Sequence, residues 1–120
     1  TFAGWVPHDA LEPYYARASV CVVPSRWPEP FGMVGVEAMA RARPVIGFAV
    51  GGIPDWLDDG VTGILVPEAD TDALGAAIAR LLGDPRRAAE LGRAGLARVR
   101  EHFQPDRYLD RLMRILEEAL

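Results

Sequence analysis

The chain of 120 residues contains no lysine, and its 13 basic side chains are all arginine. In a chain this rich in alanine, we interpret this usage as genomic codon bias rather than as a phosphate-binding patch. The acidic side chains number 17, which gives a net charge of −4. An acidic balance argues against a protein that grips the backbone of a nucleic acid, so we expect no nucleic-acid partner.

Cysteine is almost absent as well. The single Cys21 lies inside an apolar run, which excludes a disulfide framework and a cysteine-based metal site. Histidines and carboxylates show no metal-ligand spacing, so we expect no metal cofactor. No apolar run approaches the length of a membrane-spanning helix, and the N-terminus does not resemble a signal peptide. We therefore expect a reducing, cytoplasmic location, the inner face of the membrane included.

The length suits one domain with a real core, and we treat residues 1–120 as a single domain. Apolar runs and helical periodicities alternate, which favours an α/β fold with a parallel sheet and flanking helices. The expected strands cover residues 1–6, 20–23, 45–48 and 63–66. The expected helices cover residues 9–18, 33–43, 71–82, 85–102 and 105–120, with a short piece at 55–57.

Residues 24–40 read PSRWPEPFGMVGVEAMA and carry most of the functional information. They follow an apolar strand and lead through a glycine-bearing turn into a helix. Free backbone N–H groups and the helix dipole at such a turn point toward an anion. We expect the N–H groups of Phe31, Gly32, Met33 and Val34 to bind a diphosphate, with Gly32 allowing close approach.

Two carboxylates flank this turn. Glu37 lies about one helical turn inside the helix, and its side chain leans back toward the turn. It could accept hydrogen bonds from vicinal hydroxyls, as the acidic ribose ligand of dinucleotide folds does. Glu29 lies between two prolines in a rigid extended loop and could reach the ligand from the other end. Taken alone, Glu37 could equally be a solvated helix-surface acid, and Glu29 is better explained as an exposed loop acid than as a functional residue.

The joint spacing, E-P-F-G-x-x-x-x-E-A-M-A, strongly resembles the E-x7-E signature of retaining nucleotide-sugar glycosyltransferases. These enzymes form family 4, or group 1, of the two-domain GT-B fold. The resemblance covers nearly the whole chain, because further family blocks follow in order: Pro44-Val45-Ile46, Gly51-Gly52-Ile53-Pro54, Asp59-Gly60, residues 62–67 and residues 70–82.

The resemblance implies that Glu37 binds the donor's ribose hydroxyls and that the backbone of residues 31–34 holds the diphosphate. It assigns Glu29 to the transferred sugar beside the reacting carbon, as the catalytic residue. A hexosyl group would move from a UDP-, GDP- or ADP-sugar to an unspecified glycan, lipid or small-molecule acceptor, with retention. In the favoured same-face substitution, the leaving phosphate helps deprotonate the acceptor and Glu29 supports an oxocarbenium-like transition state. Glu29 as a covalent nucleophile is the less favoured alternative.

The chain also departs from the family pattern. Ala42 stands where the family usually has glycine at the end of the motif helix, and Asp55 stands where glutamate is common. An alanine in the left-handed cap conformation costs on the order of 1 kcal/mol. We therefore expect a different helix end at Ala42.

The resemblance further implies a partial Rossmann-like C-terminal domain that lacks its first two strand-helix units and the N-terminal acceptor domain. The missing parts carry the cations that grip the diphosphate, so we expect the isolated chain to be inactive. In the usual strand order 3-2-1-4-5-6, residues 1–4 form strand three, and the missing strands would separate it from residues 20–23. This strand would either pair beside residues 20–23 or dock on another chain, and its exposed edge favours self-association.

Two further hypotheses accompany the donor-binding one. The chain could be a stand-alone nucleotide-sugar-binding or interaction module of the same fold, without chemistry of its own. A dinucleotide-binding oxidoreductase fits the architecture but lacks a G-x-G-x-x-G turn.

Overall fold

Three parallel strands form the centre of the molecule, β1 (Cys21–Val23), β2 (Val45–Phe48) and β3 (Gly63–Val66), in that order across the sheet. The computed structural model describes residues 1–119 and gives the backbone alone for residues 108, 111, 112 and 119. In the register, Cys21 lies opposite Val45, and Val45 lies opposite Gly63. β2 is buried along its whole length, as expected of a parallel strand that is covered on both faces.

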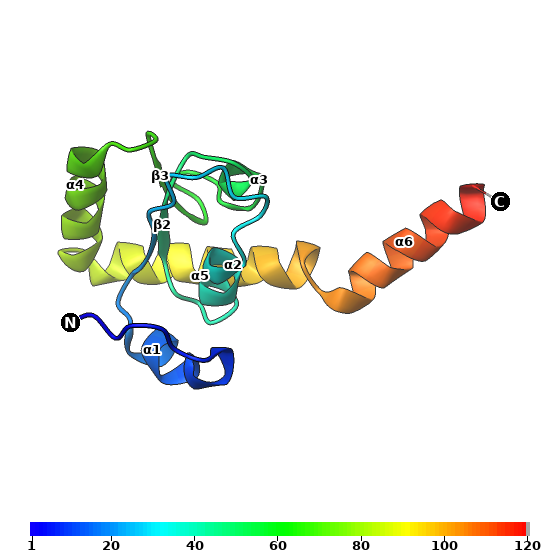
Figure 1. Ribbon diagram of the computed structural model, residues 1–120, viewed down its shortest axis with the longest axis horizontal. Helices are drawn as coiled ribbons and strands as arrows, with labels where there is room; N and C mark the ends of the chain where they lie inside the picture. Colours follow the sequence, from blue (N-terminus) through cyan, green and yellow to red (C-terminus); the bar gives the residue numbers. More distant parts are fainter. Residues whose placement is uncertain (120) are drawn as a thin grey trace.

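Helices cover both faces of this sheet (Figure 1). α4 lies on one face and α2 on the other, while α5 packs against both helices and against β3. The chain-order bounds are η1 (His8–Ala10), α1 (Glu12–Arg17), α2 (Met33–Met39), α3 (Ile53–Trp56), α4 (Thr71–Leu82), α5 (Pro85–His102) and α6 (Pro105–Ala119). This alternation confirms a partial Rossmann-like sheet with flanking helices.

The core lies between the sheet and the helices α2, α3, α4 and α5. Its largest fully buried side chains include Trp56, Phe48, Met39, Ile46 and Ile53. Trp56 and Ile53 come from α3, which stands at the carboxyl end of β2. The core therefore reaches directly beneath the loops that follow the strands.

The strand expected at residues 1–6 is wrong. These residues form no strand, since Gly4 has φ 71° and a bend follows at Trp5, and the side chains of Phe2 and Trp5 are exposed. Among the described residues, β1 pairs only with β2, so its other edge offers backbone groups that residues 1–6 do not take up. The pairing of this segment beside β1 is thus contradicted, and its docking on another chain stays a prediction.

α2 ends earlier than the sequence predicts, but its end has the left-handed residue that the family pattern indicates. Its regular part ends at Met39, before the expected Arg43. Ala42 has φ 54°, in the left-handed region, so the expectation of a different helix end is wrong. The N–H of Arg43 donates to the Ala38 carbonyl (3.0 Å) and the N–H of Ala42 to that of Met39 (2.9 Å), which is a Schellman motif. Alanine here occupies a glycine position at a conformational cost.

α6 projects away from the rest of the molecule (Figure 1). The radius of gyration is 15.6 Å, against about 14 Å for a compact domain of this length. Apolar side chains on α6 are exposed, among them Leu109, Met113 and Leu116. Within residues 1–119, none of the helices has the length and apolar character that crossing a bilayer requires.

Candidate functional site

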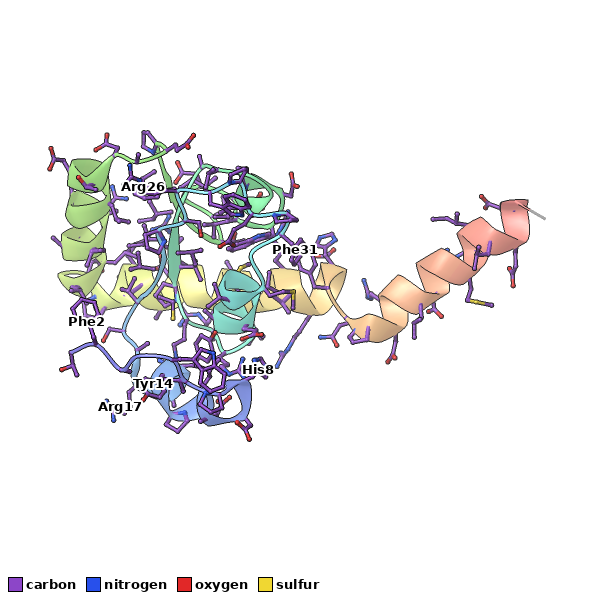
Figure 2. The ribbon with its side chains drawn as sticks, in the orientation of Figure 1. Phe2, His8, Tyr14, Arg17, Arg26 and Phe31 are labelled. Carbon is purple, nitrogen blue, oxygen red and sulfur yellow. The ribbon has the colours of Figure 1, made fainter. Side chains whose placement is uncertain are left out.

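The loop between β1 and α2, residues 24–32, carries Glu29 at the carboxyl end of the sheet. The Ser25 hydroxyl donates a hydrogen bond to Oε1 of Glu29 (2.7 Å). The carboxylate is half-buried, whereas Trp27 on the same loop is 70% exposed. Figure 2 labels Arg26 and Phe31 on this loop, on the opposite side of the sheet-and-helix body from Tyr14 in α1. The structure thus fixes one oxygen of Glu29 and leaves Oε2 available.

The loop after β2 fixes the backbone on both sides of Glu29. The N–H of Gly52 donates to the Glu29 carbonyl (2.8 Å). A Cβ on Gly51 would overlap the Glu29 main chain, and a Cβ on Gly52 would overlap the carbonyl of Pro30. Only glycine permits this backbone-to-backbone contact, which we call the glycine seam. The Gly-Gly pair is therefore more than the simple turn that its sequence indicates.

Trp56 holds the other end of the loop. Its indole N–H donates to the Phe31 carbonyl, and its ring lies where a side chain on Gly35 would stand. Phe31 in turn packs edge-on against Phe103 at the end of α5, with ring centroids 5.7 Å apart. The loop is thus anchored to α3 and to α5, and neither anchor is evident from the sequence.

The start of α2 matches the expected anion-binding turn in its backbone. Gly32 is the N-cap residue with φ 81°, and a Cβ there would lie 3.0 Å from Oε2 of Glu29. No described residue accepts a hydrogen bond from the N–H groups of Phe31, Gly32, Met33 or Val34. These four N–H groups and Oε2 of Glu29 therefore lie at the same turn.

Glu37 lies one turn further along α2, where α1 covers it. The Tyr15 hydroxyl donates to Oε2 of Glu37 (3.1 Å), and Nδ1 of His8 lies 3.8 Å from Oε1. The Glu37 side chain keeps 22% of its surface exposed. Figure 2 shows His8 near α2, beside α1. Glu37 is consequently a half-buried carboxylate with one bonded oxygen and is not a freely solvated acid.

Burial raises the pKa of Tyr15 to about 12, with the hydrogen bond to Glu37 and the charge of that carboxylate adding to the rise. Burial and the neighbouring carboxylate both favour the protonated phenol, so Tyr15 acts as a hydrogen-bond donor at neutral pH. Burial also raises the pKa of the Cys21 thiol.

The two glutamates belong to separate networks. No hydrogen bond joins them in the described part of the chain, and they share no partner there. Their positions on one loop-helix unit were predicted from the sequence. The sequence does not identify Tyr15, Ser25 or Trp56 as supports; its one signal for Tyr15 is a place in the apolar periodicity of the helix expected at residues 9–18. Residues 1–119 hold no group of three or more histidine, cysteine or carboxylate side chains placed to bind a metal ion.

A family described as "Glycosyl transferases group 1" matches residues 1–84. D-inositol 3-phosphate glycosyltransferase 1 of Catenulispora acidiphila is 39% identical over 114 residues, which cover 95% of this chain and 27% of that protein. The chain therefore spans about a quarter of the length of this curated relative.

Solved structures show the same fold. Sucrose-phosphate synthase from Thermosynechococcus elongatus superimposes with a TM-score of 0.87 at 45% identity, over 100% of this chain and 31% of that one. HepE of Anabaena, solved in complex with UDP-glucose, gives a TM-score of 0.84 at 25% identity, over 91% of this chain and 30% of that one. The three-stranded sheet thus matches part of a larger C-terminal domain.

Proposed function

The chain belongs to the group 1 glycosyltransferases, and from this we propose that it binds the nucleoside-diphosphate-sugar donor of a retaining hexosyl transfer. The observation that carries the proposal is the pair of separately held carboxylates, Glu29 and Glu37, on either side of the Gly32 turn. The proposal is further supported by HepE, a relative of the same fold that was solved with UDP-glucose.

In this proposal Glu37 accepts hydrogen bonds from the ribose hydroxyls, and the N–H groups of residues 31–34 hold the diphosphate. Glu29 meets the hydroxyls of the transferred sugar. As the bond between the anomeric carbon and the phosphate oxygen breaks, positive charge grows on the sugar ring, and the carboxylate of Glu29 stabilises it. The departing phosphate takes the acceptor proton, and the acceptor oxygen bonds to the same face of the anomeric carbon.

The site's own chemistry suits Glu29 for this supporting role. Ser25 occupies Oε1 and leaves Oε2, which lies beside the Gly32 turn, for the transferred sugar next to the diphosphate. We propose no metal ion in the donor site.

Calorimetric titration with UDP, GDP and ADP tests the proposal directly. We expect one of the three to bind, and Glu37→Gln to weaken it by roughly 1–3 kcal/mol, the value of a lost charged hydrogen bond. Glu90→Gln is the matched control, because Glu90 lies on α5 and pairs with Arg86 and Arg87, outside the motif. Equal binding by all three proteins would exclude the ribose role, and a folded chain that binds none of the nucleotides would favour a non-catalytic module.

A further inference from the structure

Tyr15 is a buried residue beside the candidate site, with 6% of its surface exposed. It belongs to α1, yet its hydroxyl points to α2. Two acceptors lie within reach of that hydroxyl, Oε2 of Glu37 at 3.1 Å and the carbonyl oxygen of Val34 at 3.4 Å. A phenol has one proton, and the carboxylate is both the nearer and the charged acceptor. The hydrogen bond therefore goes to Glu37.

The Tyr15 ring is itself held in place by Arg41. The guanidinium carbon lies 4.7 Å from the ring centroid. The same guanidinium donates to Oε2 of Glu12 (2.6 Å) and to the main-chain carbonyl of Glu37 (2.9 Å). The hydrogen bonds of Arg41 thus go to a side chain of α1 and to the backbone of α2. Within the described residues Arg41 makes no hydrogen bond to the Glu37 carboxylate, so it supports the tyrosine and leaves the carboxylate to Tyr15.

The second oxygen of Glu37 stays open. No described residue donates a hydrogen bond to Oε1, and the nearby His8 side chain is 78% exposed with its Nδ1 at 3.8 Å. That separation exceeds a hydrogen bond. One carboxylate oxygen is therefore fixed and the other is free to accept.

We propose that Tyr15 is a positioning residue, which fixes the Glu37 carboxylate through Oε2 so that Oε1 is presented to the ribose hydroxyls of the bound nucleotide. This inference rests on the proposed function, since it needs a ribose at Glu37. It adds a residue outside the E-x7-E motif to donor recognition. A fixed carboxylate loses less rotational freedom on binding than a mobile one, and this favours affinity.

A purely structural role would give Tyr15 a different signature. If the hydroxyl only holds α1 against α2, its loss changes stability and weakens all nucleotides alike. If it acts through Glu37, its loss weakens only ligands that carry ribose hydroxyls. A 2′,3′-dideoxy nucleotide separates the two roles.

The experiment compares UDP with 2′,3′-dideoxy-UDP by calorimetry, or the corresponding GDP or ADP pair if wild type prefers that base. The variants are Tyr15→Phe, Glu37→Gln and the double substitution. Tyr14→Phe is the matched control, because it makes the same change one position earlier on α1, at a side chain that is 49% exposed. We expect Tyr15→Phe to weaken the ribonucleotide about 3- to 10-fold and the dideoxy form not at all. We expect no further loss when Tyr15→Phe is added to Glu37→Gln.

The other outcomes distinguish failure of the positioning role of Tyr15 from failure of the proposed function. Equal weakening of both nucleotides, or wild-type affinity in Tyr15→Phe while Glu37→Gln loses affinity, overturns the positioning role and leaves the proposed function standing. No discrimination between the two nucleotides by wild type and by Glu37→Gln overturns both. If Tyr15→Phe does not fold, 3,5-difluorotyrosine at position 15 keeps the hydroxyl as a more acidic donor. A changed affinity for the ribonucleotide alone then supports the role, and parallel changes or none overturn it.

Discussion

Tyr15 and Glu37 lie far apart in the sequence, yet a hydrogen bond between their side chains joins them in the fold. The sequence predicts Glu37 because helical geometry turns its side chain toward the mouth of the glycine turn. It does not predict the partner, since a hydrogen bond across 22 positions depends on how α1 docks on α2. Glu29 shows the same limit, because the bond from Ser25 depends on the fold of the loop.

From the raised pKa of Tyr15 we predict how the stability of the folded chain depends on pH. The unfolded chain releases the phenol proton near pH 10, whereas the folded chain holds it to about pH 12. Stability is therefore fully present below pH 10 and falls as the pH rises toward 12, by about 2 kcal/mol. The absence of lysine keeps this range free of ammonium titration. Urea unfolding of wild type and Tyr15→Phe from pH 8 to 12 measures it.

In that experiment Tyr14→Phe is the control, and it should lose stability with pH as steeply as wild type does. The Cys21 thiol contributes a fall of the same sign in every variant, so it cancels in the comparison. An equal slope for Tyr15→Phe and wild type would contradict a raised pKa at Tyr15.

Among the elements, the three strands and the long helices can be predicted from the sequence, whereas the conformation of residues 1–6 and the glycine seam cannot. The apolar run ending at Val23 is a local signal that the structure confirms. At the start of α4, which the sequence places at residue 71, the Asp70 carboxylate accepts a hydrogen bond from the N–H of Ala73 (2.9 Å). Residues 1–6 look like a strand locally, but a parallel strand needs a neighbour, and none of the described residues provides one. The glycine seam is equally invisible, because it joins two loops that only the sheet brings together.

The glycine seam makes the second prediction. Gly52→Ala would force a methyl group into the carbonyl of Pro30. We expect a loss of about 2 kcal/mol in the free energy of unfolding, the usual effect of overpacking, with weaker donor binding as the Glu29 loop moves. Gly75→Ala on α4 is the matched control, since a Cβ there meets no atom within 4 Å, and it should stabilise the helix by about 0.5–1 kcal/mol. Chemical denaturation of both variants would refute the seam if Gly52→Ala were neutral.

The end of α2 makes the third prediction. Ala42 holds φ 54° within a Schellman motif, and glycine adopts that region without a steric penalty. Ala42→Gly should therefore raise the free energy of unfolding by about 1 kcal/mol, measured by the shift of the urea midpoint. Ala79→Gly in the exposed interior of α4 should do the opposite. A destabilised Ala42→Gly would mean that the left-handed cap is not strained.

The molecule as a whole is a partial domain, and two of its surfaces have no partner within the described residues. One is the outer edge of β1, and the other is the apolar side of α6, which projects from the body (Figure 1). The sequence predicts α6 as a helix from its periodicity. Its projection could not be predicted, since periodicity says which face is apolar and not what covers it.

At this scale we expect activity to depend on parts outside the chain. The chain spans 27% of a D-inositol 3-phosphate glycosyltransferase. We predict donor binding by the chain alone and hexosyl transfer only when an N-terminal acceptor half is supplied. Product formation from a UDP-, GDP- or ADP-sugar, assayed with and without that half, measures the difference. Turnover by the isolated chain would contradict the prediction.

Self-association belongs to this scale as well. A chain that ends at Gln104 lacks the exposed apolar side chains of α6, including Leu109, Met113 and Leu116. We expect its free energy of unfolding to lie within about 1 kcal/mol of the full chain's, because exposed side chains contribute little burial energy. If the full chain associates through α6, the shortened chain should sediment as a monomer at the same concentration. Association that persists without α6 would instead implicate the open edge of β1.

The glycine seam also bears on how such a site evolves. Main-chain groups fix the loop of Glu29, so its outward side chains, such as the exposed Trp27, are free to change without moving the carboxylate. Under the proposed function, mutational drift at those positions would alter the choice of sugar without moving Glu29. We therefore expect descendants of this scaffold to diverge in donor preference through the side chains of one loop, and to retain both glycines opposite it.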